Sequence, residues 1–147
     1  MQIYYWCPYL TNIATIKSVI RSAKSLKKYT KLNLGEINEV TILNSSGEWN
    51  FLKKNLFNIN IKNLLPFDFF KFLPKEGLVQ SRLSFLIIFF ANFFPLLFYI
   101  NNKKPTYLIV NLLTLLPIIL SPLLSRHTRI ILRISGLPNL NFFRKFI

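Results

Sequence analysis

The chain has 147 residues, enough for one domain with a substantial core. Its 19 Lys and Arg outnumber 5 Asp and Glu, which favours an anionic partner such as nucleic acid, a phosphorylated substrate or a membrane surface. Abundant Lys, Asn, Ile and Phe, as an AT-rich genome encodes, explain part of this excess. The single cysteine, Cys7, excludes an internal disulfide, and with only one histidine it excludes a zinc site of usual composition. No glycine-rich nucleotide-binding loop is present, and we expect no cofactor.

The first 29 residues organise the chain. Residues 2–6 predict a buried strand and residues 7–11 a tight loop, and Asn12 is suited to cap a helix. Apolar residues then recur at helical spacing, with cations towards the C-terminal end, which indicates an amphipathic helix. In open parallel sheets, ligands bind beyond the carboxyl ends of the strands. We therefore expect the functional site to begin at residues 7–15.

Further strands and connections follow. Residues 30–38 predict a connection, residues 39–44 a second strand and residues 49–56 a short helix. Residues 57–61 alternate between apolar and polar side chains and predict a third strand.

Residues 64–77 mix aromatic rings with lysines between prolines, which rules out a long helix. Two interpretations stay open for this loop. Its phenylalanines cover the core, or the loop enters a lipid interface, where rings and cations both find partners. The residues that would meet the membrane are Phe67, Phe69, Phe70, Lys71 and Phe72.

Two long uncharged runs, residues 83–102 and 105–125, dominate the second half. Each is long enough to span a bilayer, so an integral membrane protein with a helical hairpin at 83–125 is the alternative interpretation. Residues 107–111, however, are typical of a buried parallel strand, and residues 129–134 predict another strand. The order helix, strand, helix, strand favours an α/β core. A turn at 135–139 and the start of a helix at 140–147 complete the chain.

Three short motifs carry a resemblance to a known family. Residues 4–15 (YYWCPYLTNIAT) resemble the first strand, loop and helix start of bacterial family 4 glycosyltransferases, nearest to those that build surface polysaccharides. Gly47-Glu48-Trp49 resembles that group's turn after the second strand, and residues 132–138 (LRISGLP) its loop after the fifth. The resemblance implies an α/β, Rossmann-like three-layer domain with a mainly parallel sheet, the N-terminal half of a GT-B fold. It covers nearly the whole chain.

The resemblance also implies an activity. A sugar would pass from a nucleotide-sugar to a polysaccharide or lipid-linked glycan acceptor. Residues 1–147 would be the N-terminal, acceptor-side domain; no E-x7-E pair occurs, so the C-terminal nucleotide-sugar domain would be absent. Because the chain stops inside an element, we expect a fragment or split reading frame, inactive alone. We expect it in the cytoplasm, peripheral at the inner face of the cell membrane, on an anionic membrane surface and without nucleic acid.

Sugar transfer requires charge stabilisation for a diphosphate leaving group and an oriented acceptor hydroxyl. Arg133, at the end of the fifth strand, either binds phosphate or pairs with water or a carboxylate. Residues at a helix N-terminus favour anions, and those in the loop after the fifth strand offer a hydroxyl and a backbone amide. The candidate substrate-binding residues are Asn12, Ala14, Thr15, Glu48, Asn111, Arg133, Ser135 and Gly136.

Two departures from the family pattern leave the catalytic residues unassigned. Where many members have glycines after the first strand, this chain has Cys7, Pro8 and Asn12, and where many have a histidine after the fourth strand it has Asn111. An amide hydrogen-bonds a hydroxyl but does not titrate near neutral pH. Glu48 either accepts from an acceptor hydroxyl or is a solvated turn residue. We expect Cys7 to be a small buried hydrophobe and His127 a surface residue at the far end of the sheet.

Overall fold

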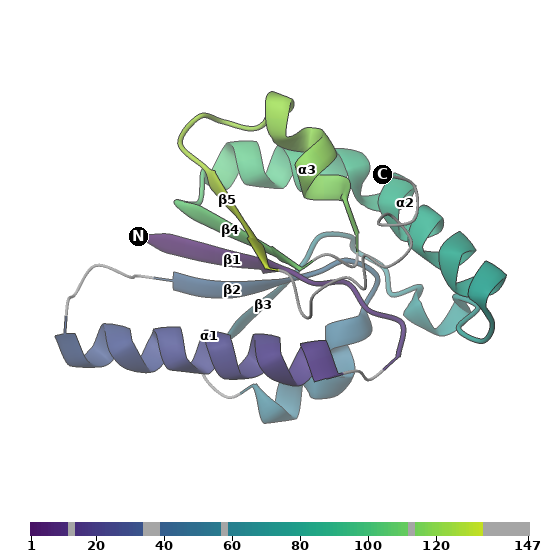
Figure 1. Cartoon of the computed structure of the whole chain (residues 1–147), viewed down its shortest axis with the longest axis horizontal. Helices are drawn as coiled ribbons and strands as arrows, with labels where there is room; N and C mark the ends of the chain where they lie inside the picture. Colours follow the sequence, from purple (N-terminus) through teal and green to yellow (C-terminus); the bar gives the residue numbers. More distant parts are fainter. Residues whose placement is uncertain (12–13, 34–38, 57–58, 112–113, 134–147) are drawn as a thin grey trace, which may run out of the picture.

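Five parallel strands form one sheet in the order β3-β2-β1-β4-β5 (Figure 1). The structure, a computed structural model, describes residues 1–11, 14–33, 39–56, 59–111 and 114–133. The strands are β1 (Gln2–Trp6), β2 (Glu39–Asn44), β3 (Asn60–Asn63), β4 (Tyr107–Asn111) and β5 (Arg129–Arg133). This order is Rossmann-like and confirms the predicted α/β class.

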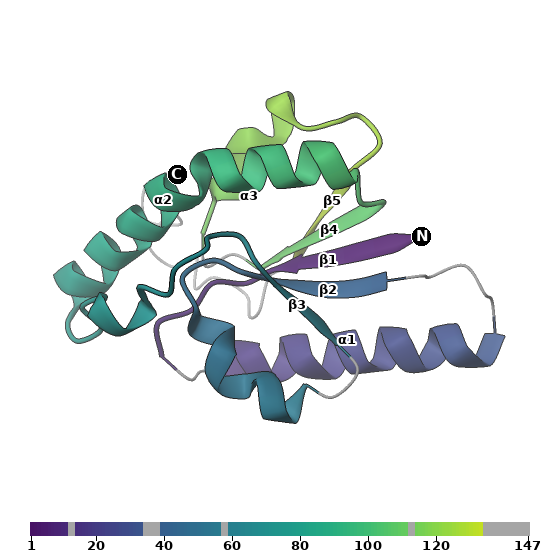
Figure 2. The ribbon, with the colours of Figure 1, turned by 180° about the vertical axis from the view of Figure 1, so that it is seen from behind.

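Helices cover both faces of the sheet (Figures 1 and 2). On one side, the α1 face, lie α1 (Ala14–Asn33) and the 3-10 helix η1 (Glu48–Asn55). On the other side, the α2 face, lie α2 (Leu78–Lys103), α3 (Leu116–Leu120) and the 3-10 turn η3 (Ser121–Leu123). A further 3-10 turn, η2 (Phe70–Phe72), precedes α2. The arrangement is therefore a three-layer α/β sandwich.

The α1 face is built as the helical pattern predicts. Ile16, Val19 and Ala23 are buried at spacings of three and four residues and belong to one core cluster with Tyr5 and Ile42. The helix continues to Asn33, beyond residue 29, where we expected a connection to begin. No proline or glycine precedes Gly35 in this stretch, so nothing in the sequence stops the helix earlier.

The α2 face contains both uncharged runs. Residues 83–102 lie within α2, which buries Leu96 and Ile100 in one cluster with Trp6 and Val110. The run 105–125 instead forms β4, the short α3 and η3, so the described residues contain no helical hairpin. In the described part of the chain, α2 is the one helix long and apolar enough to cross a membrane, by length and composition alone.

Two local predictions change in the structure. The third strand runs from Asn60 to Asn63 rather than over 57–61, because Asn63 pairs with Asn44, whose Nδ2 donates to Asn63 Oδ1 at 2.8 Å. Residues 57 and 58 lie outside the described residues.

The aromatic loop divides between the two interpretations of it. Phe70 is buried, with its ring centroid 6.0 Å from that of Tyr9, so it covers the core and does not face a membrane. Phe67 and Phe72 are 60% and 85% exposed. Lys71 is also exposed, and Phe69 is half-buried against the core. The 3-10 turn explains this split, because it points neighbouring residues in different directions.

Candidate functional site

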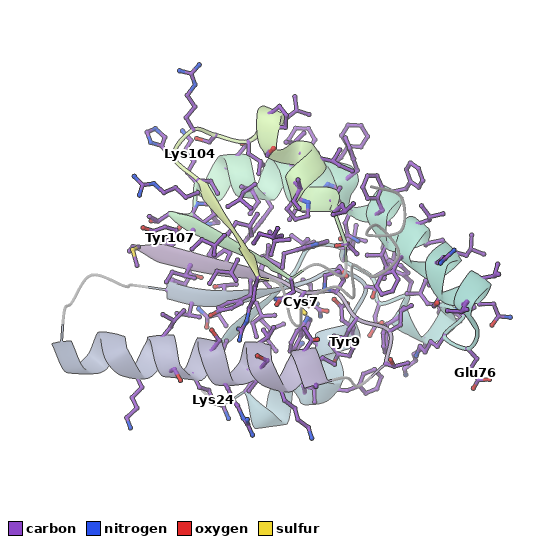
Figure 3. All side chains as sticks on the ribbon, in the orientation of Figure 1. Cys7, Tyr9, Lys24, Glu76, Lys104 and Tyr107 are labelled. Carbon is purple, nitrogen blue, oxygen red and sulfur yellow. The ribbon has the colours of Figure 1, made fainter. Side chains whose placement is uncertain are left out.

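The carboxyl ends of the strands meet at one edge of the sheet, which we call the carboxyl edge. The chain leaves β1 towards β2 on one side, whereas β4 lies on the other side of β1, so the strand order reverses between β1 and β4. Open α/β sheets bind ligands at such a point. Cys7 lies at this edge, and Tyr107 and Lys104 lie at the opposite end of the sheet (Figure 3).

Asn111 ends β4 beside this reversal. It is 1% exposed, and neither its Nδ2 nor its Oδ1 has a hydrogen-bond partner in the described part of the chain. It lies opposite Arg133 in the register, and two residues earlier Ile109 lies opposite Tyr5, which places Asn111 on the α1 face. A buried polar group without a partner costs about 1–3 kcal/mol, so such a group calls for an explanation. A ligand contact would supply one.

Arg133 bridges β5 and α1. Its Nη2 donates to Ser18 Oγ at 2.6 Å and its Nη1 to Ser18 O at 3.5 Å. Burial raises the pKa of Tyr5 and Cys7, and the positive charge of Arg133 opposes that rise at both, so the guanidinium lies near the end of β1. Its observed partners are a serine and a helix carbonyl, and no acidic side chain pairs with it within the described ranges.

Glu48 is a structural carboxylate, and the prediction of a solvated turn residue is wrong. It is completely buried, and its Oε1 accepts from the N–H and Oγ of Ser45 at 3.2 and 2.9 Å. Its Oε2 accepts from the N–H and Oγ of Ser46 at 2.7 and 2.8 Å. Burial raises the pKa of Glu48, and these hydrogen bonds act against that rise. Its oxygens are thus occupied, which removes Glu48 from the residues that contact substrate.

The turn before Glu48 requires glycine. Gly47 has a φ of +103°, and a Cβ there would overlap the Asp68 carboxylate. The sequence signal was the run Ser45-Ser46-Gly47-Glu48, in which an acid at a helix start can accept from the preceding backbone.

Hydrogen bonds join the loops after β1 and β2. Tyr9 Oη donates to Glu48 O at 2.7 Å, and Trp49 Nε1 donates to Cys7 O at 3.2 Å. The two rings meet edge to face, with centroids 5.1 Å apart. Sequence reasoning missed these roles of Tyr9 and Trp49, and that of Ser18 beside Arg133.

The thiol of Cys7 is buried, and burial raises its pKa to about 12. Cys7 is therefore the small buried hydrophobe that we expected, and it supplies no thiolate at neutral pH. His127 is exposed in the turn before β5, also as expected.

The remaining candidates lie at the start of α1 or beyond the described ranges. Ala14 is exposed as the first residue of α1, and Thr15 is half-buried beside it. Asn12, Ser135 and Gly136 lie outside the described residues. The structure thus brings Asn111, Arg133 and α1 to one face of the carboxyl edge and assigns Glu48 to the scaffold.

A groove opens between α2 and α3 on the other face, with a cavity volume of about 500 Å³. Thr114, at its lining, accepts from Trp6 Nε1 at 2.7 Å, which connects the groove to the end of β1. Among the described residues, no group of three His, Cys, Asp or Glu side chains could hold a metal ion. The lining residues are Arg82, Phe85, Leu86, Phe89, Thr114, Leu115 and Ile119.

Comparison with known proteins finds no relative: no family model matches the chain, and neither a curated protein nor a solved structure matches it. The chain is a small α/β domain with a five-stranded, all-parallel, Rossmann-like sheet.

Proposed function

We propose that the chain is the acceptor-binding domain of a glycosyltransferase that moves a sugar from a nucleotide-sugar to a polysaccharide or lipid-linked glycan. The observation that carries the proposal is the buried amide of Asn111, which lacks a partner where the strand order reverses. The resemblance supports it, because Cys7, Gly47 and Arg133 of its three motifs follow or end β1, β2 and β5 at the same edge.

The chemistry of Asn111 suits a sugar. A hydroxyl both donates and accepts, and an amide offers an acceptor oxygen and two donor hydrogens. In a buried position, such a pair orients a hydroxyl without competition from water. Asn111 does not titrate, so its role is to position the acceptor and not to move a proton.

Arg133 supplies the positive charge. Its guanidinium is held by Ser18 and pairs with no acid within the described residues, so its charge remains available to a phosphate. The donor nucleotide-sugar would be held mainly by a second domain outside these 147 residues. We place the domain in the cytoplasm at the inner face of the cell membrane, where lipid-linked acceptors and anionic lipids are both present.

The test is acceptor binding by Asn111→Leu. Saturation-transfer NMR would compare soluble oligosaccharides with monosaccharides linked to a short polyprenyl diphosphate. We expect binding that weakens roughly tenfold in Asn111→Leu, the effect of one or two lost hydrogen bonds. Asn102→Leu, at an exposed position of α2, is the matched control and should bind as the original chain does. Absence of binding by every glycan probe, or equal binding by both variants, would contradict the proposal.

A further inference from the structure

The outward side of α2 is apolar, and we call it the apolar face. Phe90, Phe94 and Phe98 are 71%, 62% and 70% exposed. The face runs from Leu83 to Phe98, about 22 Å along the helix. Single exposed hydrophobic residues are ordinary, but a contiguous apolar surface marks an interaction site. Its members are Leu83, Leu86, Ile87, Phe90, Phe94 and Phe98 of α2, with Leu115, Ile119 and Leu123 of the α3 region.

The groove joins the two parts of this face. Leu86 lines it from α2, and Leu115 and Ile119 line it from the α3 side. The exposed side chains of both helices therefore form one surface on the layer that Figures 1 and 2 show above the sheet.

Packing distinguishes this helix from an ordinary surface helix. α2 buries Ile88, Leu96 and Ile100 on the sheet side. A surface helix normally presents charged residues on its opposite side, yet residues 83–102 contain none. The outward side of α2 is thus built for an apolar partner.

Cations surround the apolar face without acids. Arg82 precedes it, Lys103 and Lys104 follow it, and Arg126 lies in the turn after η3. All 5 Asp and Glu of the chain lie at or before Glu76. An apolar surface bordered by cations complements a bilayer whose acyl region lies below anionic headgroups.

We propose that the apolar face inserts into the boundary between headgroups and acyl chains of an anionic bilayer, as a monotopic docking surface. This goes beyond the proposed function, since it does not depend on which reaction the domain serves. α2 begins beyond the carboxyl edge, as the position of Glu76 shows (Figure 3). Docking therefore brings the carboxyl edge to the membrane.

Two other occupants fit the charges and packing less well. A second copy would bring Arg82, Lys103 and Lys104 of each chain together with no acid to pair them. A spanning helix would have to leave the sheet, and Asn92, which is buried and donates to Ile88 O at 2.9 Å, would enter the bilayer.

The test is flotation with vesicles of phosphatidylcholine and phosphatidylglycerol, compared with vesicles of phosphatidylcholine alone. Flotation separates bound protein from aggregates. We expect the double variant Phe90→Ser/Phe94→Ser to float at least tenfold less, because it removes two large apolar groups from the insertion. The matched control is Phe51→Ser, which changes a 61% exposed phenylalanine of η1 on the opposite face and should float as the original chain does. Circular dichroism checks that each variant is folded.

The cations have a matched control as well. Lys103→Gln should weaken flotation with the anionic vesicles alone, whereas Lys24→Gln, on the outer side of α1, should change neither (Figure 3). Equal flotation of the double variant and Phe51→Ser would overturn the proposal. So would a loss of self-association with unchanged flotation, which indicates a second copy, or resistance to alkaline carbonate, which indicates a spanning helix. Glycan binding is measured without vesicles, so the two proposals fail separately.

Discussion

The two halves of the carboxyl edge differ in how their polar groups are satisfied. At the ends of β1 and β2, Glu48 accepts four hydrogen bonds and Trp49 donates two. At the end of β4, the amide of the equally buried Asn111 has no partner within the described residues. The closed half therefore holds the loops in place, and the open half is available to a ligand.

The largest expected effect comes from the closed half. Glu48→Ala leaves two backbone N–H groups and two serine hydroxyls buried without an acceptor, so we expect the free energy of unfolding to fall by about 3 kcal/mol or more. Urea denaturation measures it. Glu76→Ala, at an exposed position, is the control and should leave the free energy of unfolding within about 0.5 kcal/mol. A small effect of Glu48→Ala would show that the loops do not depend on this carboxylate.

The pH dependence of stability reports on the same group. Burial raises the pKa of Glu48 above its ordinary value of 4.5, so the folded state holds this proton more tightly than the unfolded state does. Its contribution is complete below pH 4.5 and is lost as pH rises through the folded pKa. We expect unfolding free energies measured across that range to fall more steeply for the original chain than for Glu48→Gln. Parallel curves would contradict the assignment.

A smaller effect is expected where the loops meet. Tyr9→Phe removes only the hydroxyl that donates to Glu48 O, so the free energy of unfolding should fall by about 1 kcal/mol. Thermal unfolding would compare it with Tyr107→Phe, a change at the half-buried start of β4. If both variants unfold at the same temperature, the hydrogen bond between the loops contributes nothing.

Strand positions and the fold class followed from the sequence, because continuous apolar runs such as residues 107–111 identify buried parallel strands. The roles of individual polar residues did not follow. Glu48 and Asn111 were equal candidates in the sequence, because their hydrogen bonding depends on how the loops close. Phe70 and Phe72 are two residues apart, yet one is buried and one exposed, which depends on the position of Tyr9.

The most direct measurement compares two buried asparagines, each at the end of a strand. Asn44 donates to Asn50 and Asn63 and accepts from the N–H of Trp49, whereas Asn111 has no partner in the described part of the chain. We expect Asn44→Leu to lower the free energy of unfolding by about 2–3 kcal/mol, and Asn111→Leu to leave it unchanged or raise it by about 1 kcal/mol. Equal destabilisation by both would show that the Asn111 amide has a structural role, and the open half of the carboxyl edge would not be a ligand site.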